Sequence, residues 1–238
     1  MRIFISDLHL DQPDTPAFET FAALLESESR RAESIHILGD LCEVWVGDDD
    51  DGPLAVALRG ALRATTARCA VSILHGNRDF LFGERFARET GIQLLTDPTL
   101  LDDGTLVAHG DAFCTDDHAY QQARETLRSP AWQAGVLALP LAERRVLAAG
   151  MREQSQRTNA NKAANIMDVS QAEVSRVVRT SGARRLVHGH THRPGVHICD
   201  WGSRYVLGAW ERCGWLLRTA SDAEPRLECF ALTGHYET

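Results

Sequence analysis

The chain has 238 residues, of which 44% are hydrophobic and 24% charged, and its formal net charge at pH 7 is −8. This composition predicts a globular protein with a substantial core, built as one large domain or as a domain that carries an insertion. The acidic balance argues against a nucleic-acid-binding protein, which would present a basic face. It does not argue against an anionic substrate, because bound metal ions can reverse the local field.

No apolar run reaches the roughly 18 residues that a transmembrane helix needs, and no secretory signal precedes the first predicted strand. The six cysteines show no CxxC or other paired spacing of the kind that predicts a disulfide framework or a zinc site. We therefore expect a cytoplasmic protein with reduced thiols. The sequence leaves contact with a membrane surface open.

The first 111 residues alternate strand-like and helix-like segments. Apolar residues recur at helical spacing in residues 16–31, 54–67 and 84–90, and short apolar runs lie between these segments. Gly91 follows the third segment, at a position where glycine commonly ends a helix. This alternation predicts a layered α/β domain.

The alternation stops after Asp111. Residues 115–179 contain no convincing strand and are predicted to form helices that are broken at Pro130 and Pro140. Strand-like runs return at residues 185–187, 196–199, 205–208, 211–217 and 226–231, and we expect them to form an antiparallel meander. The predicted organisation is an α/β core, residues 1–114 and 180–238, interrupted by a helical lid insertion at residues 115–179.

Five short apolar runs end in side chains of metal-ligand type. The first is followed by Asp7 and His9, the second by Asp40, the third by Asn77, the fourth by His109, and the fifth by His190 and His192. Ligands of open α/β sheets bind at the carboxyl ends of strands. A single Asp or His at a strand end is usually a turn residue, but five such events predict one shared site. In an extended segment, Asp7 and His9 would point to the same side of the backbone.

The count of ligands fits two metal ions. If Asp40 is shared, seven side chains give four contacts to each ion and leave positions for water and substrate. Imidazole and carboxylate without thiolate suit manganese, iron, zinc or cobalt. Two divalent cations, partly neutralised by Asp7 and Asp40, would attract phosphate oxygens, and Arg78 beside Asn77 could grip one of these oxygens with two donors. The pattern therefore predicts hydrolysis at phosphorus.

These motifs resemble the calcineurin-like metallophosphoesterase family, whose signature is D-x-H, GD, GN-[HR]-[DE], H and GH-x-H. The resemblance implies an α/β fold, a sandwich of two sheets flanked by helices, with a dinuclear site. It implies that one ion takes Asp7, His9, Asp40 and His192, and that the other takes Asp40, Asn77, His109 and His190. Many members carry His where this chain has Arg78. Because a guanidinium keeps its proton, Arg78 favours a leaving group that departs as a stable anion.

A narrower resemblance is to the bacterial UDP-2,3-diacylglucosamine diphosphatases, carried by SDLHLD, GDLCEVWVGDD, HGNRDFL, HGDAFCTDD and HGHTHRP. It implies manganese-dependent hydrolysis of UDP-2,3-diacylglucosamine in lipid A biosynthesis. Water attacks the α phosphorus, and UMP and 2,3-diacylglucosamine 1-phosphate are released. Catalytic roles fall to Asp40, Asn77 and Arg78. Substrate contacts are expected at Asn77, Arg78, Asp117, Ser155, Asn159, Lys162 and His190.

The insertion is expected to act as a lid over the substrate. Ser155, Asn159 and Lys162 share one face of a predicted helix and suit sugar and phosphate recognition, although such a stripe can also be a solvated helix face. Asp117 could accept hydrogen bonds from substrate or could cap a helix.

Residues 132–149 are rich in apolar side chains and include Arg144 and Arg145. They predict a cleft for two acyl chains, a basic-edged patch on an anionic membrane surface, or the core of the lid. We expect a lipid-linked UDP sugar as substrate and peripheral contact with the cytoplasmic face of the inner membrane. The alternatives are a metallophosphoesterase acting on another nucleotide diphosphate or on a phosphodiester, and a metal-binding scaffold.

Overall fold

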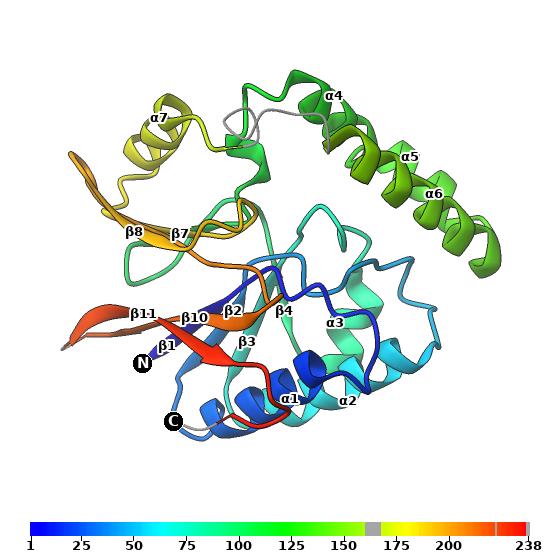
Figure 1. Ribbon diagram of the computed structural model, residues 1–238, viewed down its shortest axis with the longest axis horizontal. Coiled ribbons are helices and arrows are strands. Elements are labelled where there is room, and N and C mark those ends of the chain that lie inside the picture. The colour runs from blue at the N-terminus through cyan, green and yellow to red at the C-terminus, as the bar shows by residue number, and fades with distance from the viewer. Residues whose placement is uncertain (160–167, 222, 237–238) are drawn as a thin grey trace.

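The computed structural model describes residues 1–159, 168–221 and 223–236, and two β-sheets face each other at its centre (Figure 1). The strand order of the first sheet is β11-β10-β1-β2-β3-β4. Its strands are β1 (Arg2–Ile5), β2 (Ser34–Ile37), β3 (Ala70–Leu74), β4 (Gln93–Leu95), β10 (Cys213–Ala220) and β11 (Ala223–Ala231). Strands β1 to β4 run parallel, and β10 is antiparallel to both β1 and β11.

The second sheet has the strand order β5-β6-β7-β9-β8. Its strands are β5 (Thr99–Leu100), β6 (Thr105–Ala108), β7 (Arg185–His188), β8 (Gly195–Cys199) and β9 (Gly202–Val206). Strands β6, β7 and β9 run parallel, whereas β5 and β8 are antiparallel edge strands. The predicted α/β architecture of two sheets flanked by helices is confirmed.

Three helices cover the outer face of the first sheet (Figure 1). They are α1 (Pro16–Glu28), α2 (Pro53–Thr66) and α3 (Glu84–Thr90). Helix α1 begins where predicted because the Thr15 side chain accepts a hydrogen bond from the Phe18 amide and Pro16 occupies the first turn. Helix α3 ends at Gly91, whose φ of 77° is the left-handed conformation that glycine adopts readily.

The space between the two sheets is filled by apolar side chains from both of them. Phe4 and Leu74 from the first sheet, with Leu38 directly after β2, pack with Val107 and Val187 from the second sheet. Because these strands are buried on both faces, their sequences are nearly continuous apolar runs rather than alternating ones. This double burial is why the strand ends could be located from sequence.

Four helices follow the short helix η1 (Asp111–Phe113). They are α4 (His118–Leu127), α5 (Pro130–Leu137), α6 (Leu141–Asn159) and α7 (Gln171–Ser181). Pro130 is the first residue of α5, and Pro140 directly precedes α6, as predicted. Helices α4 to α6 extend beyond the strand ends, whereas α7 covers the second sheet (Figure 1).

Helix α7 contributes Val174 and Val178 to the apolar cluster that contains Leu186 of β7. We therefore propose that the lid insertion ends before α7 and that this helix belongs to the core.

The prediction of one antiparallel meander after residue 185 is wrong. The late strands form two separate hairpins, β8–β9 in the second sheet and β10–β11 in the first. Strand β9 runs parallel to β7, and β10 crosses to the first sheet to pair with β1. The apolar pattern of a strand does not show which sheet the strand joins.

No helix among the described residues is both long enough and apolar enough to cross a membrane.

A buried carboxylate joins α1 to β10 and to the segment that follows β11. The Glu28 side chain has no exposed surface, and it pairs with Arg31 at 2.6 Å and with Arg218 of β10 at 2.7 Å. The hydroxyl of Tyr236 lies 3.0 Å from Oε1 of Glu28. Burial alone would raise the pKa of Glu28, but hydrogen bonds from Arg31, Arg218 and Tyr236 lower it to about 2.

We expect Glu28→Gln to lower the free energy of unfolding at neutral pH by about 3 kcal/mol, because lowering a pKa from 4.5 to about 2 corresponds to about that energy. The folded-state pKa is depressed, so this stabilisation is complete above about pH 4.5 and is lost as the pH falls toward 2. Urea unfolding across this range measures it. Glu26→Gln removes an exposed pair on the same helix and should cost less than about 1 kcal/mol. Equal stability of the two variants would contradict this assignment.

Candidate metal centre

Within each sheet, the strands that precede the predicted ligands end at the same position along the strand direction. Ile5 pairs with Ile37, and Ile37 pairs with Ile73, so β1, β2 and β3 end together. In the second sheet, Ala108 pairs with His188 at the ends of β6 and β7. The following loops therefore meet at one edge of the sandwich, as expected for an open α/β sheet.

Hydrogen bonds join these loops within and between the sheets. The amide of His9 donates to the carbonyl of Asp40 at 3.0 Å, and the amide of Gly189 donates to the carbonyl of His109 at 2.9 Å. The amide of His190 donates to the carboxylate of Asp7 at 2.9 Å, which links the second sheet to the first. The site is thus assembled across the sandwich.

Five residues other than glycine have positive φ in the described part of the chain, and all five are predicted ligands. They are Asp7 (55°), His9 (49°), Asp40 (51°), His190 (67°) and His192 (54°). The expectation that Asp7 and His9 lie in an extended segment is therefore wrong. Such backbone costs about 1–3 kcal/mol per residue and gathers at functional sites. The turns point the side chains inward, and the concentration of strain marks this region as a functional site.

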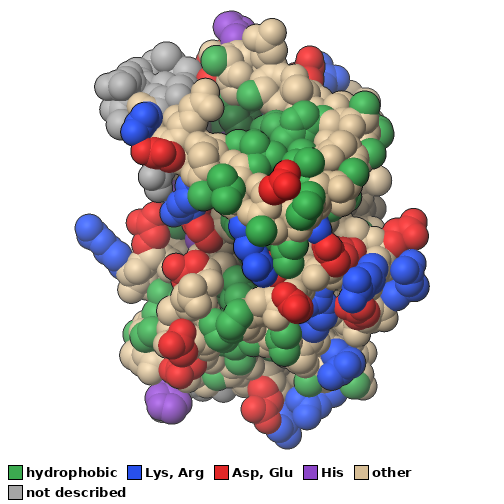
Figure 2. Space-filling view, turned by 90° about the vertical axis from the view of Figure 1, so that its right-hand side faces the viewer, with side chains coloured by type: hydrophobic (Ala, Val, Ile, Leu, Met, Phe, Trp, Pro, Cys, Tyr) green, Lys and Arg blue, Asp and Glu red, His purple; other side chains and the backbone are tan. Residues whose placement is uncertain are grey.

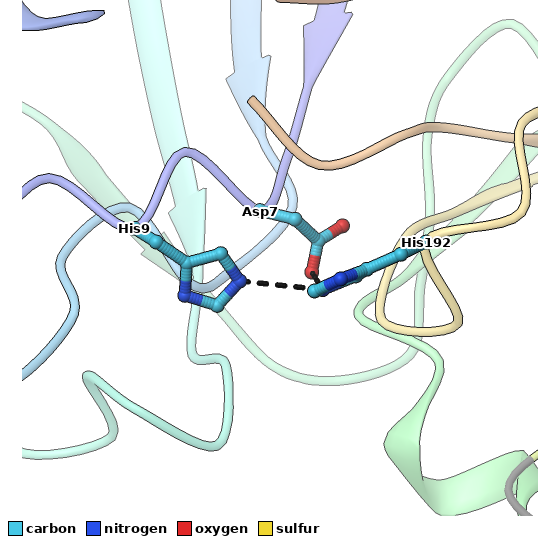
Figure 3. A group of neighbouring side chains, drawn as sticks. All are labelled: Asp7, His9 and His192. Carbon is cyan, nitrogen blue, oxygen red and sulfur yellow. Dashed lines mark hydrogen bonds and ion pairs between the residues drawn. The ribbon is translucent and has the colours of Figure 1, made fainter. Parts of the chain in front are cut away.

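The first group of ligand atoms contains Asp7, His9 and His192 (Figure 3). The Nε2 atoms of His9 and His192 lie 3.2 Å apart, and Nε2 of His192 lies 3.5 Å from Oδ1 of Asp7. Nε2 of His9 is 3.9 Å from Oδ2 of Asp40. Two imidazole lone pairs and two carboxylates facing one point form a donor set that suits a divalent cation.

The second group of ligand atoms surrounds the amide oxygen of Asn77. This oxygen lies 3.0 Å from Nε2 of His109 and 2.9 Å from Nδ1 of His190. Nε2 of His109 is 3.7 Å from Oδ1 of Asp40. The two oxygens of Asp40 therefore face different groups, as a bridging carboxylate requires.

A backbone carbonyl fixes the ring of His109 on the side that faces away from the site. Its Nδ1 donates to the carbonyl oxygen of Leu38 at 2.9 Å, so Nε2 is the nitrogen that faces the site. Metal-binding histidines usually have such a partner, which fixes the tautomer and the ring orientation.

The electrostatics of the buried site favour positive charge. Burial would lower the pKa of His109, but the surrounding carboxylates, with Asp40 first, raise it to about 9. Burial raises the pKa of Asp40. Burial and the neighbouring His109 lower the pKa of His190 to about 3, which leaves this ring neutral and able to act as a ligand. The carboxylates around His109 thus attract positive charge, which a bound cation can supply, whereas His190 stays neutral.

The loop that carries Asn77 and Arg78 is held by the buried carboxylate of Asp79. This carboxylate accepts hydrogen bonds from the amides of Gly76 at 2.8 Å and Leu41 at 2.7 Å. The amide of Arg78 donates to Oδ1 of Asp40 at 2.8 Å. No role was predicted for Asp79 from the sequence, although its place in the GNRD motif marks it.

Glu43 is a second residue that sequence reasoning missed. Its carboxylate lies 3.3 Å from Nδ1 of His9 and 3.6 Å from Nη1 of Arg78, and it also pairs with Arg152 of α6. Glu43 therefore connects a predicted metal ligand, the predicted catalytic arginine and the lid. The sequence around Glu43 does not indicate this role, except that Glu43 lies three residues after Asp40.

A cavity of about 680 Å³ lies between the metal-ligand loops and helices α4 to α6. Asn77 and Arg78 line it on the core side, and Ser155 lines it on the lid side. Most of the remaining lining is apolar or aromatic: Val44, Trp45, Val46, Phe80, Leu81, Trp132, Val136, Leu147 and Met151. Nε of Arg78 has no hydrogen-bond partner among the described residues.

The other predicted substrate contacts are placed less directly. Asp117 is the N-cap of α4, where its side chain accepts a hydrogen bond from the amide of Tyr120 at 3.1 Å. It is not among the described residues that line the cavity. Asn159 is the last residue of α6, but its side chain and the whole of Lys162 lie outside the described residues.

The two arginines expected to edge a membrane patch have partners in the core. Arg144 is buried, donates to the carbonyl of Val46 at 2.6 Å and pairs with Asp49. Arg145 lies 2.6 Å from Oδ1 of Asp50. The buried Arg144 docks α6 on the acidic loop after Asp40, which supports the lid-core alternative for this residue, whereas the side chain of Arg145 is 49% exposed.

No family model matches the chain, but curated relatives match most of its length. The UDP-2,3-diacylglucosamine hydrolase of Aromatoleum aromaticum is 46% identical, covering 87% of this chain and 88% of the relative. The protein of the same name from Chromohalobacter salexigens is 44% identical, covering 96% and 97%. That from Pseudomonas aeruginosa is 42% identical, covering 90% and 93%.

Solved structures give more distant matches. An archaeal phosphodiesterase is 13% identical with a TM-score of 0.48, covering 96% of this chain and 99% of that chain. The zinc complex of Vps29 from Entamoeba histolytica is 12% identical with a TM-score of 0.46, covering 97% and 98%. At identities of 42–46% across most of both sequences, however, the curated relatives settle the assignment: the chain belongs to the UDP-2,3-diacylglucosamine hydrolase family.

Proposed function

We propose that this protein hydrolyses the diphosphate of UDP-2,3-diacylglucosamine in lipid A biosynthesis. Water attacks the α phosphorus, and the products are UMP and 2,3-diacylglucosamine 1-phosphate. The observation that carries this proposal is the contact between the candidate metal centre and a largely apolar cavity of about 680 Å³. A substrate with a diphosphate at one end and two acyl chains at the other needs both parts of this arrangement.

We assign the seven ligands to two divalent ions, for which manganese is our candidate. One ion is assigned Asp7, His9, Asp40 and His192, and the other Asp40, Asn77, His109 and His190. When bound, such a pair of ions would lower the pKa of a nucleophilic water and neutralise phosphate charge. The placement of Asp40 between the two groups of ligand atoms supports this assignment.

Arg78 is the residue that we assign to the phosphates. Its side chain is 23% exposed, lines the cavity beside Asn77 and lies 3.6 Å from Glu43, which steadies it. A guanidinium can bind two phosphate oxygens at once and keeps its proton at neutral pH. Arg78 therefore stabilises charge, and the sugar phosphate departs as an anion without a proton from this residue.

The lid supplies the apolar part of the proposed substrate site. Trp132, Val136, Leu147 and Met151 line the cavity from α5 and α6, where acyl chains can displace water. The polar side chain of Ser155 lines the same cavity and suits the sugar or its phosphate. Contacts of substrate with Asp117, Asn159, Lys162 and His190 remain part of the proposal.

We also propose that the turn between α5 and α6 contacts the cytoplasmic face of the inner membrane. Hydrophobic side chains gather on the lid face in Figure 2. The exposed apolar residues of α5, of α6 and of the turn between them include Leu137, Leu139 and Val146. Because Arg144 and Arg145 are paired with the acidic loop, this contact depends on apolar burial more than on basic charge.

The protein is expected to float with vesicles of phosphatidylethanolamine and phosphatidylglycerol in low salt. Val146→Asp should lower the floated fraction several-fold, because Val146 is 75% exposed on this patch. Val56→Asp changes an equally apolar residue, 59% exposed on α2, and should not alter flotation. If the wild-type protein stays at the bottom of the gradient, the membrane contact is wrong.

Asp40→Asn should remove both metal ions and lower turnover of UDP-2,3-diacylglucosamine by more than about 100-fold. Loss of a residue that hydrogen-bonds to a metal ligand typically lowers metal affinity or activity roughly 10–100-fold, and Asp40 is itself assigned as a ligand. Metal analysis and UMP release measure the two effects. Asp51→Asn, at a side chain 90% exposed in the same acidic region, should leave both unchanged. Retention of half of the activity by Asp40→Asn would contradict the shared-ligand assignment.

Arg78→Ala should lower kcat by roughly 100-fold or more, since one lost charge-stabilising donor typically costs that much. Metal content should stay at the wild-type value, because the Arg78 side chain is not assigned as a ligand. Loss of metal in this variant would instead make Arg78 a structural part of the metal centre.

A further inference from the structure

We propose that Arg128 is a positioning residue for the hydrolysis: its guanidinium fixes the peptide group between Gly76 and Asn77, and thereby the orientation of Asn77 and Arg78. This inference rests on the proposed function. Arg128 is the C-cap residue of α4 and lines the lid side of the cavity.

The contacts of Arg128 converge on the loop that follows β3. Its Nη2 donates to the carbonyl oxygen of Gly76 at 2.8 Å and lies 3.5 Å from the carbonyl oxygen of His75. Its guanidinium also lies over the ring of Phe80, 5.3 Å from the centroid. Arg128 therefore contacts residues on both sides of Asn77 and Arg78.

The opposite side of this loop is held by the core. The carboxylate of Asp79 accepts a hydrogen bond from the amide of Gly76 at 2.8 Å, while Arg128 binds the carbonyl of the same residue. Gly76 is thus fixed at its amide by Asp79 and at its carbonyl by Arg128. Its carbonyl belongs to the peptide bond that leads directly into Asn77, so a rotation there would move the amide ligand and the arginine after it.

A second contact anchors Arg128 to the loop that follows His109. Its Nη2 lies 3.6 Å from Oδ2 of Asp111, a fully buried carboxylate. Asp111 also accepts from the Tyr120 hydroxyl at 2.7 Å and from Nε of Arg124 at 2.8 Å, so α4 is tied to this turn along its length. Arg128 can therefore transmit the position of the lid to the loop of Asn77 and Arg78.

The chemistry of the contact requires arginine. A flat guanidinium can lie on an aromatic ring while it donates in its own plane to carbonyl oxygens. A lysine ammonium can reach one carbonyl but does not reproduce the planar stacking on Phe80.

The test compares Arg128→Ala, Arg128→Lys and Arg176→Ala with UDP-2,3-diacylglucosamine as substrate. Arg128→Ala should lower kcat roughly 10- to 100-fold, since a displacement of about 1 Å in a catalytic group costs up to that much. KM should change less than about threefold and metal content should not change, because the variant removes none of the side chains assigned to the metal ions or the phosphates. Arg128→Lys should recover part of the loss. Arg176→Ala, which removes an exposed arginine paired within α7 and away from the lid, should match the wild type.

A double variant separates positioning from a direct contact with substrate. If Arg128 acts through Arg78, the cost of Arg128→Ala should largely disappear in an Arg78→Ala background, because the two changes disable one unit. Fully additive costs, an increased KM with unchanged kcat, or a kcat within twofold of the wild type would each overturn the inference. Assays at a temperature well below every melting midpoint remove the effect of stability.

A measurement that does not need turnover keeps this test separate from the proposed function. Hydrogen–deuterium exchange in the peptide covering residues 76–82 should be faster in Arg128→Ala and unchanged in Arg176→Ala. If the wild type hydrolyses no UDP-2,3-diacylglucosamine, the proposed function fails, while unchanged exchange in Arg128→Ala would overturn the positioning role.

Discussion

The structure depends on five sharp left-handed turns placed at the ends of buried strands. Each holds a predicted ligand, Asp7, His9, Asp40, His190 or His192, in backbone that ordinary residues rarely adopt. At about 1–3 kcal/mol each, their combined cost is comparable to the whole stability of a typical domain. Only a well-packed scaffold can offset this cost, and the strands beneath the turns are accordingly buried on both faces. Hydrogen bonds to the Asp79 carboxylate and to the Leu38 carbonyl further fix the loops and the ring of His109.

Much of this arrangement could be predicted because double burial leaves a plain sequence signal. Strands that are covered on both sides are continuous apolar runs, and the polar residue that ends each run stands out, as Asp40 and His109 do. Parallel strands end at one edge, so placing the seven predicted ligands in one site required no knowledge of which strands are neighbours. The start of α1 and the end of α3 could also be predicted, because Thr15 and Pro16 favour a helix start and Gly91 favours a helix end.

Features that depend on contacts between distant segments could not be predicted in this way. Nothing local in Cys213–Ala220 shows that β10 pairs with β1 rather than continuing the second sheet. Arg144 and Arg145 look like free cations in the sequence, and only the folded chain brings the acidic loop beside them. Glu43 and Arg128 belong to the same class, because their roles come from carbonyls and charges that lie far away in sequence. Long-range polar contacts thus determine how the lid and the metal centre meet.

The central claim is that water attacks the α phosphorus of a lipid-linked UDP sugar at the candidate metal centre. Hydrolysis of UDP-2,3-diacylglucosamine in oxygen-18 water, followed by mass spectrometry of both products, tests the substrate and the attacked phosphorus together. The account predicts one oxygen-18 atom in UMP and none in 2,3-diacylglucosamine 1-phosphate. Label in the sugar phosphate, or no hydrolysis of this substrate by the metal-loaded protein, would contradict it.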